Sequence, residues 1–162
     1  MEGKEKGDMK KVLVVGSLNM DMVLSVDHHP VPGETIIGDG ITYHPGGKGA
    51  NQAYAVGKLG GDVRIIGCVG WDNNGMILTE NLAQAGVDTT AINRMPEAPT
   101  GMAIIDVDKK GDNSIIVISG ANACLTPDLL RKQKASVEWS DFIMTQLETP
   151  IDTVLELRSE ER

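Results

Sequence analysis

Aromatic side chains are scarce in this sequence: its 162 residues include two Trp, two Tyr and one Phe. So few rings leave few surfaces on which nucleic-acid bases could stack. Basic residues are also in the minority, since 15 Lys and Arg face 23 Asp and Glu and the formal net charge is −8. This charge opposes a polyanionic partner. The composition therefore argues against nucleic-acid binding.

Cysteine is rarer still, with Cys68 and Cys124 as the two examples. They have no CxxC spacing and no histidine cluster near them in the sequence, so we expect two buried free thiols rather than a disulfide framework or a zinc site. The three histidines, His28, His29 and His44, have no spacing that builds a metal site with Cys or carboxylates. We expect them at the surface or in loops.

Long apolar runs are missing as well. The first residues, MEGKEKGDMKK, are charged and lack the apolar run of a signal peptide, and no later stretch approaches the length of a membrane span. We expect a charged leader over residues 1–10, no membrane contact and a cytoplasmic protein. With 41% hydrophobic and 23% charged residues, the rest is long enough to bury one sizeable core.

What is present is an alternation of strand and helix signals. β-branched apolar runs at 11–17 and 63–69 predict strands that are buried on both faces of a parallel sheet. Helices are predicted over 49–59, where small residues recur at helical spacing, and over 74–85, with Gly86 as the stop. This order of elements is typical of a doubly wound, Rossmann-like α/β domain.

A second, smaller sheet is predicted beside the first. The β-rich runs 102–107 and 114–119 are joined by the polar turn DKKGDN, which indicates a hairpin. Together with the segment 34–43, they predict a small antiparallel sheet. Beyond the hairpin the sequence predicts a helix from Thr126-Pro127 to about Lys134, a core strand over 141–146 and a helix from Thr149-Pro150 to Arg162.

The strongest local feature is GGKGAN at 46–51, three glycines around Lys48 directly before a helix. Glycines let backbone N–H groups approach a ligand, the helix N-terminus adds donors and the lysine adds a positive charge, which suits a polyhydroxyl or anionic ligand. A Walker loop is excluded because Lys48 is followed by Gly49, and a dinucleotide fingerprint because its third glycine position is Gln52. The alternative is an ordinary glycine-rich turn before a helix.

Three polar residues follow predicted strands. Asn19 and Asp21, in GSLNMD, come just past the first strand, and Glu148 follows the strand at 141–146. Ligand contacts gather at the carboxyl ends of strands in α/β sheets, and an Asp with an Asn can accept from and donate to vicinal hydroxyls. For Asn19 and Asp21 the alternative is a turn. For Glu148 it is a solvated loop carboxylate.

Taken in order, GSLNMD at 16–21, PGET at 32–35 and GGKGANQA at 46–53 resemble the N-terminal signature of the ribokinase (pfkB-type) family of sugar kinases. The resemblance continues through GCVGWDNNG, TGMAIIDVD, SGANACLTP and QLETP, so it covers the chain from Lys11 to about Thr153. Lys48 followed by Gly-Ala-Asn resembles the ribokinase version of the loop, whereas fructokinase-like and adenosine-kinase-like relatives usually carry other residues there. Ribose or deoxyribose is thus the expected substrate.

The resemblance implies a doubly wound α/β domain with a small β-sheet lid. It also implies transfer of the γ-phosphate of ATP to O5 of D-ribose with Mg²⁺, often with activation by a monovalent cation such as K⁺, and homodimers formed through the lid. The polar substrate-binding residues that it implies are Asn19, Asp21, Gly46, Gly47, Lys48, Asn51 and Glu148. The apolar contacts that it implies are Leu18, Ala103 and Ile105.

Family members carry a second signature late in the chain: a glycine-rich anion hole with an Asp as base, an Asn-x-x-Glu segment for Mg²⁺ and a nucleotide pocket. None of these occurs in residues 1–162. We therefore expect residues 11–162 to form the N-terminal, sugar-binding half of the domain, with no catalytic residue and no metal ligand of its own. ATP, Mg²⁺ and K⁺ would be bound mainly by a C-terminal half.

Three other functions stay open at this point. The chain could be a non-catalytic fragment that binds sugar and dimerises through the lid. It could belong to a kinase for a related sugar such as deoxyribose or fructose. A nucleotide-binding regulatory domain is the third, and it rests on the α/β pattern alone.

Overall fold

A parallel sheet organises the computed structural model, which describes residues 9–159. Most of the predicted leader (residues 1–8) and the predicted helix end (160–162) lie outside the described residues. The sheet has four strands in the order β5-β4-β1-β8, all parallel. Its strands are β1 (Lys11–Val15), β4 (Asp62–Gly70), β5 (Ile92–Met95) and β8 (Phe142–Thr145).

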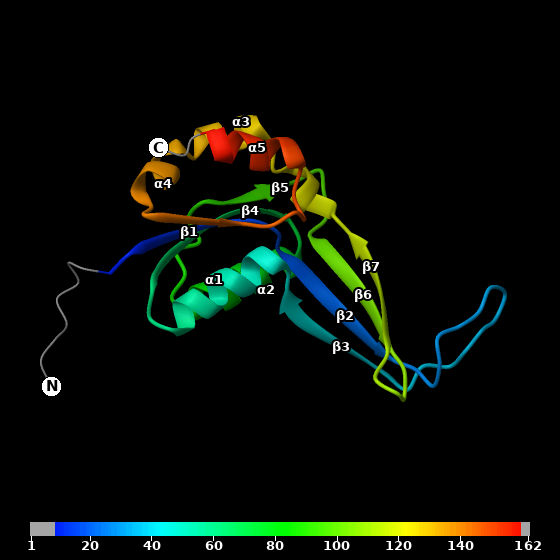
Figure 1. Cartoon of the computed structure of the whole chain (residues 1–162). Coiled ribbons are helices and arrows are strands. Elements are labelled where there is room, and N and C mark those ends of the chain that lie inside the picture. Colours follow the sequence, from blue (N-terminus) through cyan, green and yellow to red (C-terminus); the bar gives the residue numbers. More distant parts are fainter. Residues whose placement is uncertain (1–8, 160–162) are drawn as a thin grey trace, which may run out of the picture.

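Helices cover both faces of this sheet (Figure 1). On one face lie α1 (Lys48–Lys58) and α2 (Asn73–Gln84), and on the other lie η1 (Gly120–Cys124), α3 (Pro127–Lys132), α4 (Lys134–Trp139) and α5 (Ile151–Ser159). Side chains alternate along a strand, so Val14 of β1 packs in the first core while Leu13 and Val15 pack in the second. This three-layer arrangement confirms the predicted doubly wound α/β class.

A second four-stranded sheet, which we call the lid sheet, extends away from the first (Figure 1). Its order is β3-β2-β6-β7, and its strands are β2 (Asn19–Ser25), β3 (Gly40–Gly46), β6 (Gly101–Val107) and β7 (Asn113–Ile118). The predicted hairpin of β6 and β7 is confirmed. The prediction of a purely antiparallel sheet is wrong, because β2 and β6 pair in parallel. Between β2 and β6 the chain forms β4 and β5 of the main sheet together with α1 and α2, and that long connection permits the parallel pairing.

The strand β2 is the element that sequence reasoning placed in a loop. It follows β1 after three residues, and the apolar residues Met20, Met22 and Leu24 alternate in it with Asn19 and Asp21. That period of two was the signal for a strand. The strand predicted over 34–43 instead begins at Gly40, and the helix predicted from Thr126-Pro127 is divided into α3 and α4.

Strand register sorts the lid sheet into two faces. Asn19 pairs with Gly46 and Gly101, and Asp21 pairs with His44 and Ala103, so all of these share one face, the inner face. The opposite, outer face carries residues that include Ile41, Tyr43, Ile104, Ile116 and Ile118. Asn19 and Asp21 therefore point to the same side of the lid sheet.

Asp72 fixes the beginning of β6. Its Oδ1 accepts hydrogen bonds from Gly75 N (2.9 Å), as the N-cap of α2, and from Thr100 Oγ1 (2.6 Å), while Oδ2 accepts from Thr100 N (2.8 Å). Burial raises the pKa of Asp72, but these hydrogen bonds outweigh it and the net pKa is lowered. The carboxylate thus ties the lid sheet to the helix that packs beneath the main sheet.

The two cysteines are free thiols, as predicted. Cys68 is buried in β4, and burial raises the pKa of its thiol to about 12. Cys124 is half-buried rather than buried. None of the helices between residues 9 and 159 is long and apolar enough to cross a membrane.

Candidate functional site

The candidate site lies where the N-terminus of α1, the start of β2 and the segment after β8 meet. Glu148 links these elements: its Oε2 accepts hydrogen bonds from Ser17 Oγ (2.7 Å) and from Lys48 N (3.3 Å), and its Oε1 pairs with Lys48 Nζ. Burial raises the pKa of Glu148, but the hydrogen bonds from Lys48 and Ser17 outweigh it, and the net pKa is lowered. Glu148 is therefore an ionised acceptor, already held in place by its neighbours.

The glycine loop approaches β2 so closely that side chains have no room. Gly47, the N-cap of α1, has φ +92°, and a Cβ there would lie 2.7 Å from Asn19 N and 2.8 Å from Ser17 O. A Cβ on Gly46 would lie 2.1 Å from the Asp21 carboxylate. Gly47 thus permits a close approach between two backbones, and Gly46 makes room for the Asp21 carboxylate, neither of which an ordinary turn before a helix needs.

Asp21 is half-buried beside this loop, on the inner face of the lid sheet. Its pKa is raised, chiefly by burial and further by the negative charge of Glu148, while the charge on His44 opposes the rise. Because Glu148 already disfavours the charge on Asp21, the two carboxylates oppose a third negative charge at this place. Of the two ligand classes indicated by the sequence, the geometry favours a polyhydroxyl compound over an anion.

Asn19 is 4% exposed and accepts a hydrogen bond on its Oδ1 from Asn122 Nδ2 (2.7 Å). Ala103 is buried and Ile105 is half-buried, both on the inner face with Asp21. These positions give the polar site an apolar flank formed by β6.

Two of the residues expected in the site have side chains that do not take part in this hydrogen-bonded cluster. Leu18 is fully buried in the core between the main sheet and α1, where a Cβ on Gly67 would lie 2.3 Å from its Cδ1. Asn51 is exposed in the first turn of α1, and its side chain makes no hydrogen bond with residues 9–159. The structure brings together Asn19, Asp21, Gly46, Gly47, Lys48 and Glu148.

Sequence reasoning missed three side chains of the site: Ser17, His44 and Asn122. Ser17 is part of the motif GSLNMD and Asn122 is part of the motif SGANACLTP, but neither residue was assigned a role from the sequence. Ser17 Oγ also accepts a hydrogen bond from Gly49 N (3.4 Å), which joins the connection between β1 and β2 to the first turn of α1. The contact of Asn122 with Asn19 could not be predicted from the sequence, because the two residues are 103 positions apart.

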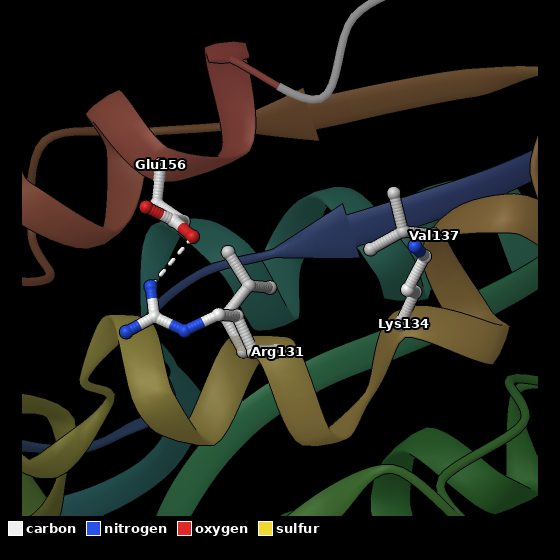
Figure 2. Close-up of a pocket in the computed structure, with 5 residues that line it drawn as sticks. Arg131, Lys134, Val137 and Glu156 are labelled. Carbon is white, nitrogen blue, oxygen red and sulfur yellow. Dashed lines mark hydrogen bonds and ion pairs between the residues drawn. The ribbon is translucent and has the colours of Figure 1, made fainter.

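A separate cavity of about 170 Å³ lies among α3, α4 and α5, on the other side of the main sheet (Figure 2). An ion pair between Arg131 Nη1 and Glu156 Oε1 (2.6 Å) borders it. Leu130, Lys134 and Val137 complete its lining. None of the predicted site residues lines this cavity.

Comparison with known proteins agrees with the motifs. The family model described as pfkB family carbohydrate kinase matches residues 9–158. Ribokinase from Haemophilus influenzae is 45% identical over 147 residues, which are 90% of this chain and 48% of that protein. The crystal structure of ribokinase from Thermotoga maritima has a TM-score of 0.87 at 41% identity, with 94% of this chain and 50% of that chain covered.

Ribokinase from Arabidopsis thaliana, whose structure was determined in complex with ribose and ATP, has a TM-score of 0.81 at 30% identity and is matched over 93% of this chain and 51% of its own. The chain thus spans about half the length of the relatives that it matches.

The close approach of the glycine loop predicts a difference between two Gly→Ala substitutions. Gly47 and Gly60 both have positive φ, but a Cβ at Gly60 would meet nothing within 4 Å. Both substitutions place Ala in an unfavourable conformation, which costs about 1–3 kcal/mol. Gly47→Ala also forces a Cβ against backbone atoms, for a further cost of about 1–3 kcal/mol.

Urea denaturation of the two variants measures the difference in the free energy of unfolding. We expect Gly47→Ala to be the less stable. Equal stability of the two variants would show that the loop is not pressed against β2.

Proposed function

The chain belongs to the pfkB family of carbohydrate kinases, and from this premise we propose that it supplies the sugar-binding half of a ribokinase, which transfers the γ-phosphate of ATP to O5 of D-ribose. The observation that carries the proposal is the group formed by Asp21, Lys48 and Glu148 around the glycine loop. Its acceptors and donors suit the hydroxyl groups of a sugar, and its two carboxylates oppose a phosphate.

Ribose is the proposed sugar for two reasons. The loop reads Lys48-Gly49-Ala50-Asn51, the form that resembles ribokinases. The three relatives compared above carry the name ribokinase, and the structure of the Arabidopsis thaliana protein was determined in complex with ribose and ATP. In this proposal Asn19 and Asp21 bind ribose hydroxyls, Gly46 and Gly47 contact the sugar through their backbone, and Lys48, Asn51 and Glu148 complete the polar ring. Ala103 and Ile105 form the apolar side, whereas the side chain of Leu18, which was expected there as well, lies in the core.

The described residues do not fit a Mg²⁺ site. Between residues 9 and 159, no three His, Cys, Asp or Glu side chains are grouped so that they could hold a metal ion. The loop at Lys48 also lacks the spacing of a Walker motif. We propose that ATP, Mg²⁺ and any K⁺ bind mainly to residues other than these.

The proposed sugar site predicts that Asp21→Ala weakens ribose binding at least about tenfold, because a charged hydrogen-bond acceptor is lost. His28→Ala is the control: His28 is exposed in the loop between β2 and β3, where it contacts Asp27 and Glu34. Isothermal titration calorimetry with D-ribose compares the two variants. Equal affinities in both would contradict the assignment of the site.

A second prediction is that residues 1–162 transfer no phosphate on their own, even when they bind ribose. Phosphoryl transfer needs a nucleotide held in line with an oriented hydroxyl and a group that takes the hydroxyl's proton. The carboxylates of the proposed site, Asp21 and Glu148, are assigned to holding the sugar. A coupled ADP-release assay with ribose, ATP and Mg²⁺ tests this, and turnover above the rate without protein would contradict it.

We also propose that two chains associate through the outer face of the lid sheet. Ile41, Tyr43, Ile116 and Ile118 share that face and are 47–62% exposed. The inner face, with Asp21 and Ala103, is left for the sugar. A sheet with apolar residues exposed over several strands is a typical association surface.

Ile116→Lys places a charge in that surface and is expected to give a monomer. The unaltered chain is expected to be a dimer, with twice the mass of one chain. Asn113→Lys is the matched control, because Asn113 is also in β7 but lies on the inner face at the strand end. Multi-angle light scattering reports the masses. A monomer before substitution, or a dimer that Ile116→Lys leaves intact, would contradict the proposed interface.

A further inference from the structure

The side-chain amide of Asn122 is held in one orientation by the backbone of Leu18. Leu18 N donates to Asn122 Oδ1 (2.9 Å), and Asn122 Nδ2 donates to Leu18 O (3.1 Å). A backbone N–H can only donate and a carbonyl oxygen can only accept, so a reversed amide would lose both bonds. Asn122 is 2% exposed and lies in η1, on a different element from Leu18.

This fixed amide in turn orients Asn19. Asn122 Nδ2 also donates to Asn19 Oδ1 (2.7 Å), so the atom of Asn19 that faces Asn122 must be an acceptor. The two side chains pack over Gly101, where a Cβ would lie 2.2 Å from Asn122 Nδ2 and 2.3 Å from Asn19 Oδ1. A side chain at that position would separate the pair.

The NH₂ group of Asn19 is left free for a ligand. Nδ2 of Asn19 makes no hydrogen bond with residues 9–159. It is nevertheless not one of the fully buried side-chain atoms that lack a partner in this range, which are Gln146 Oε1 and Thr149 Oγ1. Nδ2 therefore keeps contact with solvent although Asn19 is 4% exposed. Asn19 shares the inner face of the lid sheet with Asp21, two residues further along β2.

We infer that Asn122 is a positioning residue for the sugar site: it fixes Asn19 as a hydrogen-bond donor beside Asp21, which is an acceptor. This inference rests on the proposed sugar-binding function. A hydroxyl has one proton, so a hydroxyl that donates to the Asp21 carboxylate can interact with Asn19 only by accepting from its NH₂ group. The pair thus matches both halves of a hydroxyl group, and a reversed Asn19 would leave two acceptors facing one proton.

Asn122→Asp tests this orientation. An Asp at this position still accepts from Leu18 N, but its other oxygen faces Leu18 O and Asn19, which favours a reversed Asn19 amide that donates to it. Asn93→Asp is the matched control: Asn93 Nδ2 donates to the backbone oxygens of Gly67 (3.2 Å) and Ala91 (3.1 Å), at the far edge of the main sheet. Both variants lose an amide donor to a backbone carbonyl, from a buried position at Asn122 and a half-buried one at Asn93, but of the two only Asn122 contacts Asn19.

Calorimetry with D-ribose is expected to show at least about tenfold weaker binding for Asn122→Asp and a change within about twofold for Asn93→Asp, relative to the unaltered chain. In NMR spectra, the side-chain NH₂ signals of Asn19, identified by their loss in Asn19→Asp, are expected to shift on addition of ribose in the unaltered chain and not in Asn122→Asp. A purely structural role of Asn122 would not change that response.

Equal ribose affinity of Asn122→Asp and Asn93→Asp, while the unaltered chain binds ribose, would overturn the inference and leave the proposed function intact. No ribose binding by the unaltered chain would overturn the proposed function itself. If Asn122→Asp fails to fold by circular dichroism, Asn19→Asp decides the matter, because its carboxylate can still accept from Asn122 but cannot donate to the sugar. At least about tenfold loss of affinity is then expected, and unchanged affinity would overturn the inference.

Discussion

The contact between the glycine loop and β2 is the constraint on which the site depends. At Gly47 the loop backbone lies so close to the backbone of Ser17 and Asn19 that a Cβ would not fit, and at Gly46 the missing side chain leaves room for the Asp21 carboxylate. That approach places the N-terminus of α1 over Ser17 and Asn19 and leaves the Asp21 carboxylate against Gly46. It also brings Lys48 within reach of Glu148, which lies 100 residues further along the chain. Without the glycines, the loop, the lid sheet and the end of β8 would not meet at one point.

The charges in this region explain why it suits a neutral ligand with many hydroxyl groups. The charge of Glu148 is balanced by Lys48, and its carboxylate accepts a hydrogen bond from the hydroxyl of Ser17. These interactions lower the pKa of Glu148 by more than burial raises it. The Asp21 carboxylate accepts no hydrogen bond from residues 9–159, and burial together with the charge of Glu148 raises its pKa more than His44 lowers it. Hydrogen-bond acceptors that lack protein donors favour ligand groups that can donate a hydrogen bond. A sugar supplies such groups without adding a negative charge.

The main sheet was predictable because its strands and helices depend on local patterns. The β-branched run of β1, the small residues of α1 and Gly86 after α2, with φ +87°, each carry their own signal. The parallel pairing of β2 with β6 was not predictable, because it is set by how the intervening elements, β4 and β5 of the main sheet among them, fold rather than by either strand. Motif resemblance found Asn19, Asp21 and Lys48, whereas the role of Asn122 required knowing which side chain faces its amide.

The central claim is that a sugar binds where β2, the glycine loop and the segment after β8 meet. Backbone ¹H–¹⁵N NMR of this chain during titration with D-ribose tests it most directly. The account predicts that the largest shifts occur at Asp21, Gly46, Gly47 and Lys48, while the signals around Arg131 and Glu156 on the other side of the main sheet stay unchanged. Shifts centred on the cavity at Arg131 and Glu156, or no saturable shift at the glycine loop, would contradict it.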